Sequence, residues 1–296
     1  MLERNLSMEE MSKKLKKEQL SIEIQKIKSN YSLIIGGIIL LVIILVTILG
    51  PYLIKFDPNE MRVTQRFMPP NSTNIFGTDE FGRDLFTRIV YGARVSIFVG
   101  FSVSLVSSIL GVIIGLYASY FRILDNVLMC ICDGLMAIPG ILLAIASMAA
   151  LGNSVWNIII ALIIVYTPNV ARIARASALQ VKEQAYIEAI YTQGASSFRI
   201  MWGSIAPNII SPVIVQATFI FASAILSEAA LSFLGAGISP ADASWGSILQ
   251  ASKQVIYKAW WMVAFPGITI VLTVLSLNLL GDSLRDFFDP RIKDND

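Results

Sequence analysis

The side chains that most often carry out chemistry in proteins are scarce in this sequence. No histidine occurs in the 296 residues, so the usual general base and the commonest metal ligand are both missing. Cys130 and Cys132 are separated by one residue, which is too close for an unstrained disulfide and supplies at best half a metal site. Ser283 has no histidine to activate it as a nucleophile. The sequence therefore predicts no catalytic residue, no metal site and no cofactor bound directly by the chain.

Non-covalent recognition is the chemistry that a polar segment at 172–207 can provide. Small and apolar residues from 185 to 190 predict a short helix there, and Gly194 can adopt the left-handed conformation that ends a helix. Ser196 or Ser197 is then expected to cap a second short helix. The segment is thus predicted to be a helix-turn-helix knob with small residues at its tip, which another protein can approach closely.

The elements that must hold this knob are membrane spans. Hydrophobic residues make up 55% of the chain and charged residues only 15%, against about 25% charged in an ordinary soluble protein. A spanning helix needs about 20 mostly apolar residues. Six such runs are expected: Leu33–Ile54, Val95–Tyr120, Val127–Leu151, Val155–Val170, Ile209–Ala230 and Trp260–Leu280. The predicted fold class is therefore an all-α, polytopic membrane protein of about six transmembrane helices.

The distribution of basic residues predicts the orientation of these spans. With both termini inside, the cytosolic segments hold fifteen Lys and Arg residues and the outer segments hold eight, which favours N-in and C-in. The expected organisation is a basic cytosolic tail (1–31), a first transmembrane helix (32–55), an extracytoplasmic loop (56–94), a core (95–282) and a cytosolic tail (283–296). Within that core lie the cytosolic loop at 172–207 and an extracytoplasmic loop at 231–259. The net charge of +2 gives no reason to expect nucleic acid as a partner.

The polar knob resembles the EAA loop of ABC importer permeases. Glu188-Ala189, Gly194 five residues later, and the apolar residue before Pro207 carry the likeness, with Ile190 in place of the motif's alanine. In that family the short helix inserts into a cleft on the nucleotide-binding subunit and transmits its closure to the spans. The resemblance implies an ATPase-docking loop formed by Glu188, Ala189, Gly194, Ala195, Arg199 and Pro207.

Three further stretches resemble the dipeptide/oligopeptide/nickel group of these permeases, of the OppC/DppC type. They lie at 76–96, at 231–246 and at 278–291. The resemblance implies the type I (MetI-like) permease fold and an ATP-driven importer of di- or oligopeptides in a prokaryotic cytoplasmic membrane. The implied partners are a homologous second permease, two ATPase subunits that hold ATP-Mg, and an extracytoplasmic solute-binding protein. The same architecture carrying nickel or a metal chelate remains an alternative, as does, from another class, an ATPase-independent channel or ion-coupled carrier.

Charged residues in or near the spans are the remaining candidate site residues. Arg83, Asp84 and Arg94 belong to a dense mixture of acids and bases that either contacts substrate as a gate or holds an outer turn together by its own ion pairs. Glu228 and Asp133 lie within predicted spans, where ionisable groups are costly and often line a pathway. An interfacial position, where the charge costs little, is the alternative for both.

Overall fold

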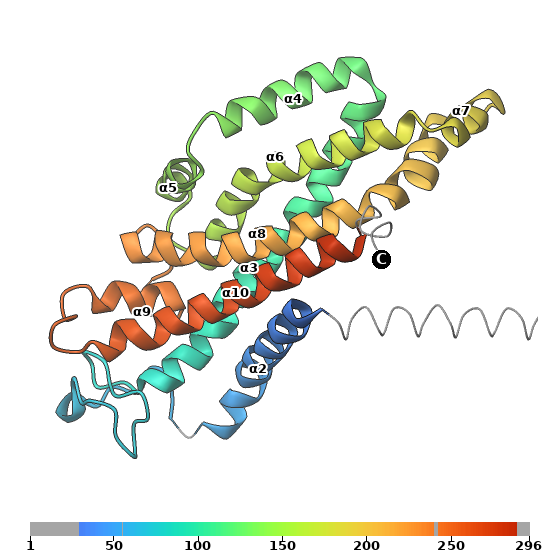
Figure 1. Ribbon diagram of the computed structural model, residues 1–296. Coiled ribbons are helices and arrows are strands. Elements are labelled where there is room, and N and C mark those ends of the chain that lie inside the picture. The colour runs from blue at the N-terminus through green and yellow to red at the C-terminus, as the bar shows by residue number, and fades with distance from the viewer. Residues whose placement is uncertain (1–29, 55, 240–241, 289–296) are drawn as a thin grey trace, which may run out of the picture.

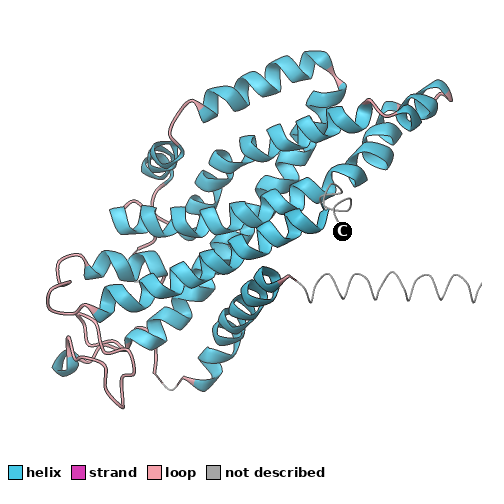
Figure 2. Cartoon of the chain, viewed as in Figure 1, coloured by secondary structure: helices cyan, strands magenta, loops and turns pink. Residues whose placement is uncertain are grey.

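The computed structural model describes residues 30–54, 56–239 and 242–288, and this part of the chain is helical with no named strand (Figures 1 and 2). Most of the predicted basic tail, residues 1–29, and the last residues, 289–296, lie outside the described residues. The α-helices are α2 (Tyr31–Leu53), α3 (Leu85–Tyr120), α4 (Arg122–Met136), α5 (Gly140–Leu151), α6 (Val155–Lys182), α7 (Ala185–Thr192), α8 (Ala206–Leu234), α9 (Trp245–Ser252) and α10 (Trp261–Phe288).

Five of these helices are long and apolar enough to cross a membrane: α2, α3, α6, α8 and α10. Helices α4 and α5 pass the same test only as a pair, and they are bent by 91°. Counting that pair as one span gives six. The predicted all-α polytopic fold of about six spans is thus confirmed for the described residues, with the bent pair in third place.

A proline accounts for the bend between α4 and α5. Pro139 has extended backbone (φ −51°, ψ 125°) and no N–H to donate, so α4 ends at Met136 and a new helix begins at Gly140. The third span was expected as one continuous helix over Val127–Leu151, and that prediction was wrong. Pro168, two residues before the expected end of the fourth span at Val170, lies inside α6 without interrupting it.

Several helix ends differ from those predicted because apolar runs mark only the part of a helix that faces lipid. Helix α3 begins at Leu85 instead of Val95, so the outer loop is ten residues shorter than expected. Helix α6 continues to Lys182, well past the predicted end at Val170, and the first third of the predicted loop at 172–207 is therefore helical. The outer segment at 231–259 is also not a plain loop, since it contains α9.

Both ends of the described bundle lie on the same face. The Ser283 hydroxyl of α10 lies 3.3 Å from Oδ1 of Asn30, the residue that caps α2. Figure 1 shows α7 at this end of the bundle and α9 at the opposite end. The even number of spans therefore brings the two ends to one side, as predicted. That this side is cytosolic stays a prediction from the basic residues.

Close packing of α3 against α6 forms the centre of the bundle. A Cβ on Gly111 would lie 2.4 Å from the Cβ of Val170, and a Cβ on Gly115 would lie 2.6 Å from the Cβ of Ala174. Small residues at such positions let spanning helices approach closely, since lipid gives no hydrophobic drive for their association. Helix α6 leads directly into α7, so the knob is attached to the most tightly packed helix pair of the bundle.

Candidate functional site

The helix of the predicted knob is α7, and it ends as its sequence predicts. Gly194 has φ +84°, its N–H donates to the Tyr191 carbonyl (3.0 Å), and the Ala195 N–H donates to the Ile190 carbonyl (3.3 Å). These two bonds form a Schellman motif, which satisfies carbonyls at the helix end and turns the chain back. The predicted left-handed conformation of Gly194 is confirmed.

The predicted second helix of the knob is not a separate element. After the turn the chain enters a π-helical segment, η2 (Arg199–Ile205), which runs without a break into α8. The Arg199 N–H lies 3.4 Å from the Ser196 hydroxyl, so Ser196 is at the predicted capping position. The fifth span therefore begins inside the knob, and a displacement of the knob would displace that span.

The base of the knob is held by apolar packing and by two hydrogen bonds, one from α8 to α7 and one from the end of α6 to α3. Ile187 is buried, with 4% of its surface exposed, and belongs to the main apolar core. The Tyr186 hydroxyl accepts a hydrogen bond from the Asn208 side chain of α8 (3.1 Å). At the end of α6, the Lys182 ammonium donates to the Ser119 carbonyl of α3 (3.0 Å). The knob is thus fixed to the bundle at its base.

The outer side of the knob is open to a partner. Five of the six residues implied by the resemblance are exposed, and Ala195 is half-buried; the exposed ones are Glu188, Ala189, Gly194, Arg199 and Pro207. Tyr191 and Phe198, each about two-thirds exposed, were not predicted. Aromatic side chains are common anchors in protein interfaces, and their presence in a polar segment was the signal that could have identified them.

The outer loop before α3 is held by its own charged groups. Asp79 accepts bonds from the Arg83 guanidinium (2.6 Å) and from the N–H groups of Phe81 and Arg83, and both charged side chains are buried. Asp84 caps α3 by accepting from the N–H and the hydroxyl of Thr87. For Arg83 and Asp84 these contacts favour the structural alternative, and a gating role stays a prediction.

The same loop carries an exposed ion pair between Arg62 and Glu60. The Arg62 guanidinium donates two hydrogen bonds to the Glu60 carboxylate (2.8 and 3.1 Å), and these lower the pKa of Glu60 from its ordinary value. Next to Arg62 the chain passes very close to Gly82, which has φ +76° and whose Cβ would overlap the Arg62 carbonyl oxygen. A side chain at Gly82 would therefore open the loop.

Arg94 lies on α3 and is bonded to the backbone of α2. Its guanidinium donates to the carbonyls of Thr47 (3.1 Å) and Ile48 (3.4 Å). Pro51, four residues after Thr47, has no N–H, so the helix itself cannot satisfy the Thr47 carbonyl. Arg94 supplies the missing donor. Its position thus fits a structural contact between two spans.

We expect Arg94→Met to weaken the attachment of α2, because it removes a charged donor that contributes about 1.5–3 kcal/mol. Thermal unfolding of the purified chain in detergent should show a lower midpoint. In a Pro51→Ala background, where residue 51 regains its N–H, the same substitution should have a smaller effect. Arg122→Met, at an exposed position, is the control. Equal losses with and without Pro51→Ala would contradict the proposed pairing.

Glu228 lies at the junction of α3, α8 and α9 and is completely buried. Its carboxylate accepts hydrogen bonds from the hydroxyls of Ser96, Ser232 and Ser244, each at 2.9 Å. The group therefore has no access to solvent in the chain, and both its role in a pathway and its depth in the membrane stay predictions. Its three donors come from different parts of the outer face, so Glu228 fixes those parts to one another.

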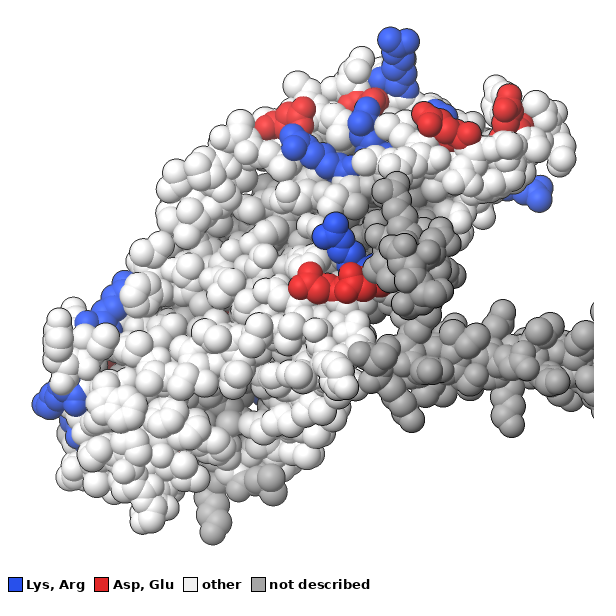
Figure 3. Space-filling view, viewed as in Figure 1, with Lys and Arg blue, Asp and Glu red and all other residues white. Residues whose placement is uncertain are grey.

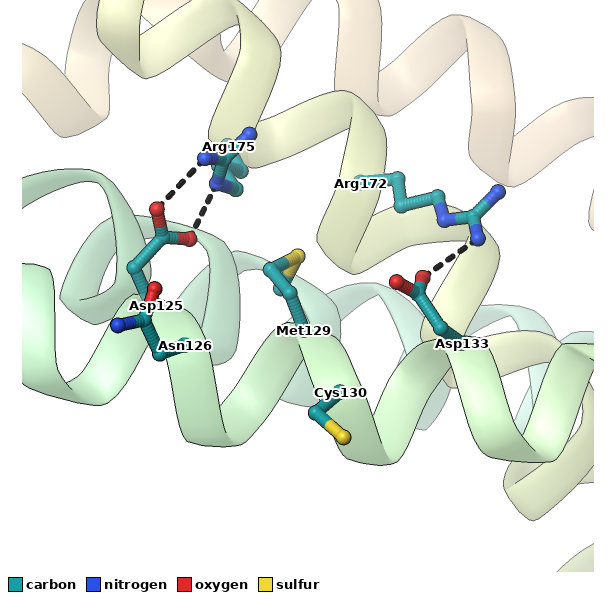
Figure 4. Close-up of a pocket in the computed structure, with 7 residues that line it drawn as sticks. All are labelled: Asp125, Asn126, Met129, Cys130, Asp133, Arg172 and Arg175. Carbon is teal, nitrogen blue, oxygen red and sulfur yellow. Dashed lines mark hydrogen bonds and ion pairs between the residues drawn. The ribbon is translucent and has the colours of Figure 1, made fainter.

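Asp133 lies apart from the other candidate site residues. It is on α4 and forms an ion pair with Arg172 of α6 (2.6 Å), and both side chains are about half-exposed. A second pair, Asp125 with Arg175, joins the same two helices (Figure 4). The structure does not bring Arg83, Asp84, Arg94, Glu228 and Asp133 into one site. Arg172 and Arg175 were not predicted as site residues, although their spacing of three on one helix was visible in the sequence.

A family model described as binding-protein-dependent transport system inner membrane component matches residues 107–294. This is more than half of the chain and includes the knob. The chain belongs to this family. A second model, the N-terminal TM domain of oligopeptide transport permease C, matches residues 23–70. The transport-component family is one of multi-pass membrane proteins, and the resemblance identified from the sequence is confirmed.

Curated relatives cover almost the whole of this inner membrane component. A putative peptide transport system permease protein of Brucella abortus is 47% identical over 94% of each chain. A dipeptide transport system permease protein of Alkalihalophilus pseudofirmus is 43% identical over 91% of this chain and 89% of its own. A di/tripeptide transport system permease protein of Pseudomonas aeruginosa is 39% identical over 88% of each.

Solved structures support the predicted MetI-like fold. A chain of the inward-facing MetNI methionine ABC transporter covers 68% of this inner membrane component and 97% of its own length, with a TM-score of 0.57 and 18% identity. A chain of an amino acid ABC transporter crystallised with histidines covers 69% and 94%, with a TM-score of 0.50 and 19% identity. At such identities the likeness concerns the fold alone.

Proposed function

We propose that this chain is one of two permease subunits of an ATP-driven importer that carries di- or oligopeptides into the cytoplasm. The observation that carries the proposal is the exposed knob of α7, Gly194 and η2 on a chain of the transport-component family. A self-contained channel or carrier has no ATPase subunit for such a knob to bind. The names of three relatives from different bacteria, all peptide permeases, support peptide as the cargo.

The proposed partners follow from what the chain offers on each face. Two ATPase subunits would hold ATP-Mg, and the knob at Glu188, Ala189 and Gly194 would enter a cleft on one of them. A homologous second permease would complete the pathway, and a solute-binding protein would deliver cargo at the face of α9. These assignments rest on the family resemblance and on the exposure of the knob.

The packing of the knob supports a mechanism by rigid-body motion. The end of α6 that leads into α7 is hydrogen-bonded to α3, α7 is hydrogen-bonded to α8, and η2 is continuous with α8. Closure of the ATPase pair would therefore move these spans together. The spans would tilt from an inward-facing to an outward-facing arrangement. The chain itself would neither hydrolyse ATP nor form a covalent bond with the cargo.

Uptake in a strain that lacks this chain tests the proposal. We expect uptake of radiolabelled di- and tetrapeptides to be lost and then restored by the wild-type chain. Restoration should fail when the partner ATPase carries an inactive phosphate-binding loop. Restoration that does not need the ATPase would instead support the carrier alternative, and restored uptake of a nickel chelate without peptide uptake would support the metal alternative.

A further inference from the structure

Helices α4 and α6 present a charged surface in a part of the chain where charge is unexpected. In Figure 3 the visible acidic and basic side chains gather towards the two ends of the molecule, and those at one end lie over α4, α6, α7 and the end of α10. Arg172 is 17 residues into α6, or about 25 Å from its outer end at 1.5 Å per residue. In a hydrocarbon core of about 30 Å, this position lies about 5 Å from the inner edge. Ionised groups near that edge still favour a protein neighbour or water over lipid.

Two ion pairs border a hollow of about 670 Å³ on this surface. One pair is Asp133 with Arg172 (2.6 Å), and the other is Asp125 with Arg175 (2.6 Å). Figure 4 shows Met129 of α4 between the two pairs, which gives the hollow an apolar middle and a charged pair at each end. The hollow is thus lined by two carboxylates and two guanidiniums that are separated by an apolar contact.

The two pairs can exchange partners because neither is fully buried: the side chains of Asp125 and Arg175 are 23% and 33% exposed, and those of the other pair are more open. Asp133 and Arg172 are 60% and 49% exposed, and an exposed ion pair is worth only about 0–1 kcal/mol. A solute with both an ammonium and a carboxylate can therefore replace each pair by a new one of the same kind at little cost. A lipid tail carries no charged or hydrogen-bonding group that could pair with the carboxylate or the guanidinium.

We propose that the α4–α6 hollow binds the charged termini of a peptide in transit, with the ammonium on the Asp125 carboxylate and the peptide carboxylate on the Arg172 guanidinium. The proposal rests on the proposed function. Asp125 and Asp133 are eight residues apart, or about 12 Å along α4. An extended chain advances about 3.3–3.6 Å per residue, so a peptide of three or four residues spans the two pairs.

A second hollow continues the polar surface along α6. Tyr166 and Asn169 lie two turns and one turn before Arg172 and line a cavity of about 240 Å³ together with Ser227 of α8. The Tyr166 and Ser227 hydroxyls are 2.8 Å apart, so they offer a neutral hydrogen-bonding pair. Polar groups thus recur at three-residue intervals along α6 from Tyr166 to Arg175.

The native thiol in the hollow provides the test. Cys130 lines the hollow and is exposed, whereas Cys132 is buried. In the assembled transporter carrying Cys132→Ala in nanodiscs, alkylation of Cys130 by N-ethylmaleimide is followed by mass spectrometry. Tetra-alanine with free termini, at twice its half-saturating concentration, should slow alkylation about threefold, because one third of the sites stay free. Acetyl-tetra-alanine-amide at the same concentration should leave the rate unchanged.

Substitutions separate recognition of the termini from simple covering of the thiol. Arg172→Gln should abolish protection by free tetra-alanine, while Arg122→Gln, at an exposed position of α4 outside the hollow, should retain it. Co-elution of the subunits shows that each variant is assembled. Equal protection by the blocked peptide would overturn the proposal. So would a Cys130 that reacts in the isolated chain but not in the assembled complex, because the second permease would then fill the hollow.

Peptide transport by the same assembled complex, reconstituted into proteoliposomes, separates this inference from the proposed function. Transport without protection of Cys130 would overturn the binding site and leave peptide import intact. Protection without transport would overturn import by this complex and leave the peptide site standing. Neither transport nor protection would overturn both.

Discussion

Gly194→Val is expected to abolish peptide uptake and ATPase co-purification while the chain still inserts into the membrane. Gly194 has φ +84°, a conformation that costs an ordinary L-residue about 1–2 kcal/mol and a β-branched residue more. To relieve that strain the turn would give up its bonds to Tyr191 and Ile190, and α7 would lose its fixed end. A strain of 1.4 kcal/mol already corresponds to about a tenfold change in an equilibrium constant.

Gly194→Asn is the matched control for this prediction. A Cβ at Gly194 would meet no atom within 4 Å, so added volume is tolerated within the chain and conformation alone distinguishes the two variants. Asparagine tolerates the left-handed region and should keep most of the uptake. If asparagine and valine were equally harmful, the tip would require the absence of any side chain, as a closely fitting cleft does. If both were harmless, the proposed docking role of this turn would be wrong.

The spans were predictable because hydropathy acts over about 20 residues at a time, but their ends were not. Arg94 led the prediction to begin the second span at Val95, whereas α3 begins at Leu85. The structure shows why charge was a poor boundary signal: Arg94 donates to backbone carbonyls of α2, and Arg88 lies near Asp79 (3.8 Å). A charged residue whose charge is satisfied inside the fold can therefore be mistaken, from the sequence alone, for the end of a spanning helix.

The knob was largely predictable because its features are local. A left-handed glycine after a short helix depends on residues within one turn, and Gly194 has the predicted conformation. The continuity of η2 with α8 was not predictable in this way. Ser196 and Ser197 are good capping residues for a new helix, but a π-helical segment at Arg199–Ile205 carries the same backbone directly into the span. Only the packing of Ile200 and Ile205 in the core decides between the two.

The long-range pairs were the least predictable part of the candidate site. Asp133 was identified as an unusual charge, but its partner Arg172 is 39 residues away on another helix, and the partner of Asp125 is 50 residues away. A single sequence gives no distance between such positions. The same is true of Ser96, Ser232 and Ser244, which are unremarkable polar residues until Glu228 joins them.

The proposed docking knob and the proposed peptide site lie in different parts of this chain. The knob belongs to α7, η2 and α8, whereas the charged hollow lies between α4 and α6, and α4 is joined to α5 by a 91° bend at Pro139. Helix α6 belongs to both regions, since its end carries the knob and its middle carries Arg172 and Arg175. Motion of the knob would therefore move one wall of the hollow relative to the other.

Glu228→Leu is expected to have the largest effect on stability of any substitution at the outer face. Each of the three serine hydroxyls donates to Glu228 and also accepts a backbone N–H: Ser96 from Trp245, Ser232 from Ile238, and Ser244 from Ser247. Leucine would leave three buried hydroxyls without an acceptor. At about 1–3 kcal/mol for each unsatisfied group, a loss of about 3 kcal/mol or more follows even if some find helix carbonyls instead. The unfolding midpoint of the purified chain should fall by about 6–12 °C.

Glu228→Gln tests how much of the stabilisation comes from the hydrogen bonds that glutamine can keep. Glutamine has the same shape and keeps one oxygen, which can still accept from Ser232 and Ser244 as Oε1 of the glutamate does. Its NH₂ group would face the Ser96 hydroxyl, which must then rotate. A loss of about 1 kcal/mol is therefore expected, well below that of leucine.

Because Ser244 begins α9, the leucine variant should also expose the α9 backbone to faster hydrogen exchange, while exchange in α7 at the far end stays unchanged. Equal exchange at α9 in wild type and leucine variant would mean that apolar packing around Trp245, and not the serine network, holds α9 in place.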